Sequence, residues 1–194
     1  MTGDKTAERP LRADAVRTRR ALLAAAADVF AELGIDASVA QVAARAGIGK
    51  GTVFGHFPTK EALLTAIVTD AVDDLVAATS ALPGDLTPDA ALLALMKLQV
   101  DRYASNRAFI ELLNTSRAAQ LPDVQAQVTR LIEAGRPIVD RAHREGSLDE
   151  ELDARDVVLL ACGLFGAAEP LLAHEPRAAD RYLRVAFRGM TRGD

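Results

Sequence analysis

Apolar residues recur every three to four positions along most of the chain, which is the spacing of one face of an α-helix. The first such stripe runs from Leu22 to Leu33 and stops at Gly34, which predicts a helix over residues 15–33. The residues before it are polar and show no period. We therefore expect a flexible basic arm over 1–14.

Two short helices are predicted next, over 39–46 and 50–57, with Gly47-Ile48-Gly49 between them. Ser38 precedes the first of these helices and is a favoured N-cap, because its side-chain oxygen accepts a hydrogen bond from an unpaired backbone N–H. Two short helices around a three-residue turn that contains glycine are typical of a helix-turn-helix motif, here over about 38–57.

Further helical stripes follow to the end of the chain. We expect helices over 59–81, 88–104, 106–118, 123–145, 153–173 and 176–190. Alanine and leucine are abundant and tryptophan is absent, which favours helix over sheet. The prediction is an all-α protein of about nine helices, with a three-helix N-terminal unit and a C-terminal helical bundle.

Composition and charge indicate the compartment of the protein and the kind of partner it binds. The single cysteine, Cys162, fits a reducing compartment, and neither a signal peptide nor an uninterrupted run of 18 apolar residues is present, so we expect a cytoplasmic protein without a membrane partner. The net charge of −4 is unevenly distributed: residues 1–60 hold nine Lys/Arg and six Asp/Glu, and the remainder is acidic. The basic end indicates an anionic partner.

The segment from Ala21 to Leu64 carries a more specific signal. It contains Val-Ala-Ala-Arg-Ala-Gly-Ile-Gly-Lys-Gly-Thr-Val-Phe-Gly-His-Phe-Pro-Thr-Lys-Glu-Ala-Leu-Leu, and it resembles the DNA-binding region of the TetR family of bacterial transcriptional repressors. The resemblance implies a helix-turn-helix DNA-binding domain over 15–75 and an effector-binding and dimerisation domain over 76–194. It also implies a homodimeric repressor that binds palindromic operator DNA and is released by a small molecule.

The residue types of this segment suit DNA. Lys50, Gly51 and Thr52 offer a charge, a close approach and a hydroxyl to base edges in the major groove. Phosphate contacts are expected from both sides of that helix and from the arm; the full set of candidates is Ser38, Gln41, Lys50, Gly51, Thr52, Phe54, His56, Lys60, Arg12 and Arg17. Where many family members have serine and tyrosine, this chain has Gly49 and Phe54, so a contact from Phe54 would be apolar.

The resemblance also places an effector pocket among the central helices. Polar or aromatic candidates there are Gln99, Arg102, Tyr103, Phe109, Asn114 and Arg117, for which plain interhelical hydrogen bonding is the alternative. Residues 157–168 are apolar on every face, and such a helix must bury all its faces. The resemblance implies that the last two helices pack against those of a second copy, so we expect a dimer interface there, with candidates Val158, Cys162, Phe165, Gly166, Tyr182, Val185 and Met190.

Catalysis, cofactors and metals are not expected. The chain contains neither a recognisable Ser/His/Asp set nor a glycine-rich phosphate loop, His143 and His174 have no metal-binding partners at helical spacing, and the acidic run 149–153 lacks the pattern of a calcium loop. The alternative function is a helical scaffold or ligand-sensing protein that acts through protein partners without binding DNA.

Overall fold

The computed structural model describes residues 8–105, 109, 119–172 and 174–191, and this part of the chain is helical apart from turns and one isolated β-bridge. The all-α prediction is confirmed. The α-helices are α1 (Glu8–Leu33), α2 (Val39–Ala46), α3 (Lys50–His56), α4 (Lys60–Ser80), α5 (Pro88–Ser105), α8 (Pro122–Arg144), α9 (Ala154–Ala168) and α10 (Ala178–Met190), with a 3-10 turn, η1 (Glu169–Leu171), after α9.

The predicted bounds differ from these by more than two residues at two places. Helix α1 begins at Glu8, so part of the expected arm over 1–14 is helical. Pro10 lies in the first turn, where its missing N–H would have no partner inside the helix anyway. At the other end, α9 stops at Ala168 instead of residue 173, because Pro170 cannot continue the backbone hydrogen-bond ladder. The helix predicted over 106–118 lies outside the described residues except for Phe109.

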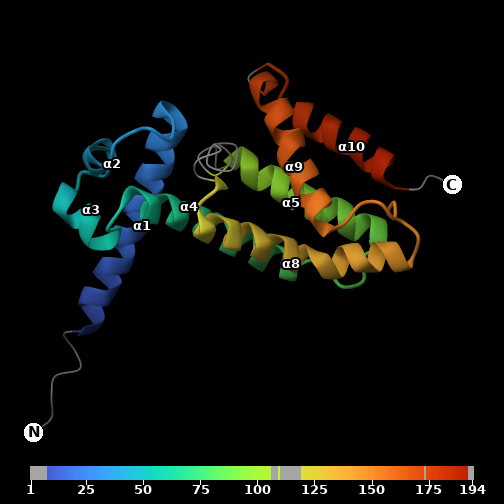
Figure 1. Cartoon of the computed structure of the whole chain (residues 1–194), viewed down its shortest axis with the longest axis horizontal. Coiled ribbons are helices and arrows are strands. Elements are labelled where there is room, and N and C mark those ends of the chain that lie inside the picture. Colours follow the sequence, from blue (N-terminus) through green and yellow to red (C-terminus); the bar gives the residue numbers. More distant parts are fainter. Residues whose placement is uncertain (1–7, 106–108, 110–118, 173, 192–194) are drawn as a thin grey trace, which may run out of the picture.

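Helices α1, α2 and α3 form a small unit at one end of the molecule (Figure 1). Phe30 of α1, Val42 of α2, Val53 of α3 and Leu63 of α4 are all at most 1% exposed and belong to one hydrophobic cluster. Phe57, just after α3, is 2% exposed in the same cluster. A shared apolar core therefore fixes the orientation of the two short helices, which are too short to be stable alone.

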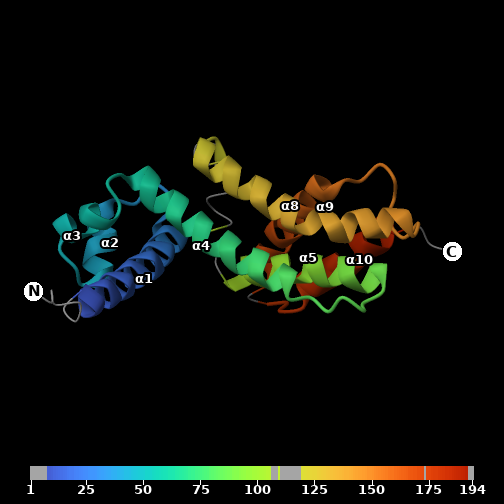
Figure 2. The same ribbon diagram turned by 90° about the horizontal axis from the view of Figure 1, so that it is seen from below.

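Helix α4 leaves this unit and runs into a bundle made by α5, α8, α9 and α10 (Figure 2). The first part of α4 packs on α1, and α4 also packs along α8 and α5. Gly135 lets α8 approach α5 closely, since a Cβ built there would lie 3.1 Å from a methyl carbon of Leu95. One helix thus belongs to both halves of the molecule.

The end of the bundle is closed by the chain's last described residues. Leu148 forms an isolated antiparallel bridge with Thr191, and the Asp149 N–H donates to the Met190 carbonyl at 2.9 Å. Leu148 is 1% exposed. None of the helices that the structure describes is both long and apolar enough to cross a bilayer.

Candidate nucleic-acid interface and internal cavity

The start of α2 is held by a capping box. The Gln41 N–H donates to Ser38 Oγ at 3.3 Å, and the Ser38 N–H donates to Gln41 Oε1 at 2.7 Å. Two backbone donors at the helix N-terminus are thereby satisfied. Ser38 and Gln41, which were predicted to contact DNA, are both exposed. The polar atoms that form the capping box already hydrogen-bond each other within the chain.

The turn between α2 and α3 needs glycine at one position. Gly47 has φ +65°, in the left-handed region, and its N–H donates to the carbonyls of Ala43 and Ala44. The Ile48 N–H donates to the Ala43 carbonyl at 3.0 Å. This closure ends α2 and sets the direction in which α3 begins at Lys50.

Helix α3 has one inward and one outward side. Val53 faces the core, whereas Lys50, Gly51, Thr52 and Gly55 are exposed. A Cβ added at Gly51 or Gly55 would meet nothing within 4 Å. The chain's own packing therefore does not require either glycine, although glycine weakens a helix. Gly55 was not among the residues predicted from the sequence. Its spacing of four residues places it on the same side of α3 as Gly51.

Cationic side chains around α3 lie close to aromatic rings. The Lys50 ammonium lies 5.7 Å from the ring centroid of Phe54, which is 38% exposed, so Phe54 packs beside a charge at the helix surface. The Arg19 guanidinium of α1 lies 4.6 Å from the centroid of Phe57. The ring of His56, which is half-buried, lies 6.3 Å from that of Phe57. Arg19 thus joins His56 at the C-terminal end of α3.

Lys60 is the first residue of α4 and carries a positive charge where the helix dipole is also positive. Its ammonium lies 5.8 Å from the ring centroid of Phe30. The N-cap Thr59 accepts the Ala62 N–H at 3.0 Å through its hydroxyl. An anion placed here would meet a cation and a helix N-terminus together.

The predicted arm contacts are only partly placed. Arg17 is exposed on α1 and pairs with Asp14 one turn earlier, so part of its charge is balanced within the chain. The Arg12 side chain lies outside the described part of the structure. Arg19 is better placed than Arg17, because its guanidinium reaches the end of α3.

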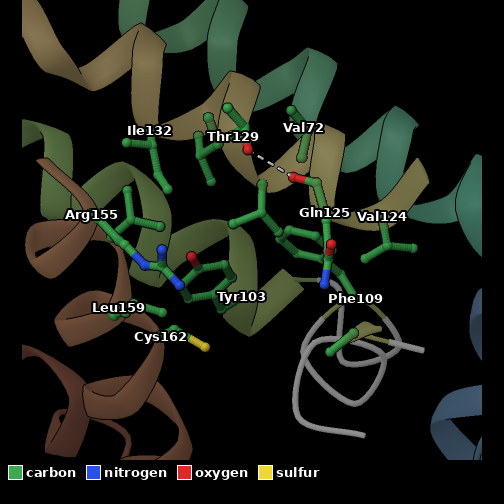
Figure 3. A pocket seen from close by; sticks show the side chains of 14 residues that line it. Val72, Tyr103, Phe109, Val124, Gln125, Thr129, Ile132, Arg155, Leu159 and Cys162 are labelled. Carbon is green, nitrogen blue, oxygen red and sulfur yellow. Dashed lines mark hydrogen bonds between the residues drawn. The ribbon is translucent and has the colours of Figure 1, made fainter. Parts of the chain in front are cut away.

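A cavity of about 470 Å³ lies in the bundle between α4, α5, α8 and α9 (Figure 3). Its lining is mainly apolar and consists of Val72, Tyr103, Phe109, Ala119, Val124, Gln125, Val128, Thr129, Leu131, Ile132, Arg155, Val158, Leu159 and Cys162. Pockets of this size and character hold small organic molecules.

Two of the predicted pocket residues line this cavity and two do not. Tyr103 and Phe109 are in its wall, with ring centroids 5.6 Å apart. Gln99 is buried elsewhere on α5, and Arg102 instead pairs with Asp74 of α4 at 2.6 Å. Asn114 and Arg117 lie outside the described residues.

The sequence reasoning missed most of the cavity's polar groups. Arg155, Gln125 and Thr129 have no motif around them that marks a pocket, and Cys162 was assigned to the dimer interface although it lies in the wall. Burial raises the pKa of the Cys162 thiol and of the Tyr103 hydroxyl, because charge is disfavoured in an apolar wall. Both groups are therefore neutral near pH 7.

The predicted dimer residues divide into two groups. Val158, Phe165 and Met190 are at most 5% exposed within a single chain, so the prediction that they form an outer interface is corrected: they belong to the chain's own core. Gly166 and Val185 are exposed, and Tyr182 and Cys162 are half-buried. Leu159 and Leu160, which the prediction omitted, are 51% and 36% exposed on α9.

Comparison with protein families matches both halves of the chain. Residues 22–67 match bacterial regulatory proteins of the tetR family, and residues 87–192 match the SbtR-like C-terminal domain of transcriptional regulators. Among curated relatives, the HTH-type transcriptional regulator RutR of Escherichia coli strain K12 is 32% identical over 84 residues. This match covers 43% of the chain and 40% of RutR, less than half the length of either protein.

Solved structures of other proteins resemble this chain over nearly its whole length. A TetR transcriptional regulator from Streptomyces coelicolor is 26% identical, with a TM-score of 0.63 and coverage of 91% of this chain and 99% of that one. A tetR-family regulatory protein from Rhodococcus RHA1 shares the fold at 24% identity and a TM-score of 0.72, with coverage of 91% and 98%. The chain belongs to the TetR family of bacterial regulatory proteins, with a C-terminal domain of the SbtR-like type.

Proposed function

We propose that the protein is a transcriptional repressor that binds palindromic operator DNA as a homodimer and releases it when a small molecule enters the bundle. The observation that carries this proposal is the outward side of α3, where Lys50, Gly51, Thr52 and Gly55 are exposed on a helix that is held in place by its opposite side.

Helix α3 suits the major groove. Its N-terminal turn presents the Lys50 ammonium and the Thr52 hydroxyl, which hydrogen-bond base edges. Gly51 and Gly55 have no side chain that projects from this side of the helix, so the backbone approaches bases closely over two turns. In a helix-turn-helix protein the N-terminal residues of the second helix read the bases, which is the position of Lys50 here.

Phosphate contacts would flank α3 on both sides. Lys60 and the N-terminus of α4 lie just after α3, and Arg19 of α1 lies at its C-terminal end. At the other side, the capped N-terminus of α2 presents Ser38 and Gln41. Contacts of this kind position the protein on DNA, whereas the base contacts of α3 provide sequence preference.

The outer side of α9 and α10 is the proposed dimer interface. Leu159, Leu160 and Val185 are three of the few large apolar side chains that are exposed in the described residues. Gly163 and Gly166 lie among them on α9, and a Cβ at either meets nothing within 4 Å in the single chain. A second copy packed here would cover the leucines and set the spacing of two recognition helices.

Helix α4 is the proposed route between ligand and DNA. Val72 of α4 lines the cavity, and the first residue of the same helix, Lys60, lies beside α3. A ligand that binds one position of α4 more tightly than another shifts the population of dimers toward one spacing of the recognition helices. By linkage, operator DNA then weakens ligand binding by the same factor.

Gel-shift titrations with the DNA upstream of the protein's own gene test the DNA-binding role. If each protomer neutralises three or four phosphates, log K falls with log salt concentration at a slope of about −5 to −7. A scrambled duplex of the same length and base composition is the control, and footprinting shows whether a palindrome is protected. Equal affinity for both duplexes at every salt concentration contradicts sequence-specific operator binding. A folded dimer that retards neither duplex contradicts the proposal and favours a scaffold that acts through protein partners.

A further inference from the structure

Among the described residues that line the cavity, Arg155 is the only charged one. Arg155 extends from α9 toward the side of the cavity where the Tyr103 hydroxyl lies (Figure 3). The apolar remainder includes Val72, Leu131 and Ile132. A binding site of this composition favours a molecule that is mostly apolar and carries negative charge.

Arg155 makes no ion pair with any described residue. Two arginines of the bundle, by comparison, pair with a glutamate: Arg136 with Glu133 at 2.6 Å and Arg181 with Glu175 at 2.8 Å. Arg155 is also the second residue of α9, where a cation opposes the helix dipole. The neighbouring carboxylate of Asp153 accepts the backbone N–H of Arg155 at 2.7 Å, as the N-cap. An anion in the cavity would give the guanidinium a partner.

Tyr103 supplies the second recognition group. It is 0% exposed, and its hydroxyl oxygen has no hydrogen-bond partner among the described residues. A buried hydroxyl without a partner is costly, and the group normally finds one. Because burial raises its pKa, the hydroxyl keeps its proton and is a donor. The hydroxyl of Thr129 is less suited, because it already donates to the Gln125 carbonyl at 3.0 Å.

We infer that the ligand of this cavity is an apolar molecule with a single carboxylate, which pairs with Arg155 and accepts a hydrogen bond from Tyr103. This inference rests on the proposed function and names the class of its effector. One guanidinium balances the single negative charge of a carboxylate. A phosphate dianion would bring a second negative charge into a mostly apolar cavity, where it would have no partner among the described residues. An amine would meet a cation and no acid among the described residues of the wall.

Calorimetric titration of the full-length protein without DNA tests the ligand class. The probes are decanoate and 4-phenylbutanoate, each compared with the primary amide and the amine of the same carbon skeleton. At least one acid is expected to bind about ten-fold or more tightly than its amide, as for a hydrogen bond to a charged group. Arg155→Gln should remove that preference, and Tyr103→Phe should reduce it.

Arg144→Gln is the matched control, because Arg144 is exposed at the far end of α8 and is not part of the cavity wall. It should keep the preference for the acid. The inference is overturned if neither acid binds at millimolar concentration, if an amide or amine binds as tightly as its acid, or if Arg155→Gln retains the preference.

Operator binding is measured separately, so that the two proposals fail separately. If an acid binds through Arg155 and the operator affinity does not change, release by a ligand is wrong and the ligand class stands. If the amides or amines release the operator and the acids do not, the ligand class is wrong and the proposed function stands.

Discussion

The Asp73 carboxylate of α4 accepts a hydrogen bond from Arg130 of α8, with 2.8 Å between Oδ1 and Nη2. One residue further along α4, Asp74 pairs with Arg102 of α5 at 2.6 Å. The helix that begins beside α3 is therefore joined to two helices of the bundle by ion pairs. Exposed pairs contribute little each, as the proposed movement of α4 requires.

A double-mutant cycle with Asp73→Asn and Arg130→Gln should give a small coupling energy. Both side chains are about half exposed, so water screens the pair, and we expect a coupling of less than about 1 kcal/mol in the free energy of unfolding by urea. In 1 M salt the coupling should fall toward zero. A coupling above about 2 kcal/mol that resists salt contradicts this account, since it would require a buried pair.

Gly51→Ala and Gly55→Ala should affect stability and DNA binding in opposite directions. Each added methyl group meets nothing within 4 Å, so folding gains up to about 1 kcal/mol from helix propensity. DNA affinity should fall, because the methyl group lies on the side of α3 that would face the bases. Thermal unfolding and gel shifts measure the two effects on the same samples.

The matched control for these variants is Gly47→Ala. Gly47 has φ +65°, so alanine there is strained and should destabilise the turn. If Gly51→Ala and Gly55→Ala keep full DNA affinity while they stabilise the fold, the exposed side of α3 does not approach DNA closely.

Local signals predicted the helices well where they were unambiguous. The helices predicted to stop at Gly34 and before Gly47 end at Leu33 and Ala46, and Ser38 caps α2 as expected. The exceptions involve proline. Pro10 lies in the first turn of α1, where proline is tolerated, although it falls within the expected arm. Pro170 ends α9, although it falls within the helix predicted over 153–173.

The sites were predictable only where sequence neighbours form them. The side of α3 that faces out follows from seven consecutive residues. The cavity is built from four helices far apart in the chain, so Arg155 and Thr129 gave no local signal. The apolar run 157–168 predicts that α9 is buried on all sides, but a single sequence does not distinguish burial in the chain's own core, as for Val158, from burial by a partner.

Lys50→Ala and Lys60→Ala should weaken DNA binding in different ways. Lys50 lies at the start of α3, so its loss should relax sequence preference by about 1–3 kcal/mol. Lys60 lies at the start of α4, and its loss should weaken all sequences nearly equally and reduce the salt slope by about one unit. Titrations of operator and scrambled duplexes at several salt concentrations measure both. Identical losses of specificity would refute the assignment of one lysine to bases and the other to phosphates.

The N-cap of α9 should make stability depend on pH. The backbone N–H groups of Asp156 and Arg155 hold the pKa of Asp153 below its ordinary value of 3.8, because they stabilise the carboxylate. A carboxyl whose folded-state pKa is lowered stabilises the fold above its ordinary pKa, and that contribution is lost as pH falls through the folded value. Wild type should therefore exceed Asp153→Ala in unfolding free energy at pH 7, and the difference should shrink below about pH 4. Asp153→Asn, which caps without titrating, should show no such convergence with Asp153→Ala.

Val185→Glu should separate the protomers. Val185 is 57% exposed on α10, which packs against α9, and a buried carboxylate without a partner would oppose association there. Analytical ultracentrifugation should show a dimer for wild type and a monomer for the variant, with operator affinity lowered because two half-sites are no longer bound together. Leu33→Glu is the matched control, since Leu33 is 54% exposed at the end of α1, and it should remain dimeric. If Val185→Glu stays dimeric while Leu33→Glu does not, the interface lies on the α1 side of the molecule instead.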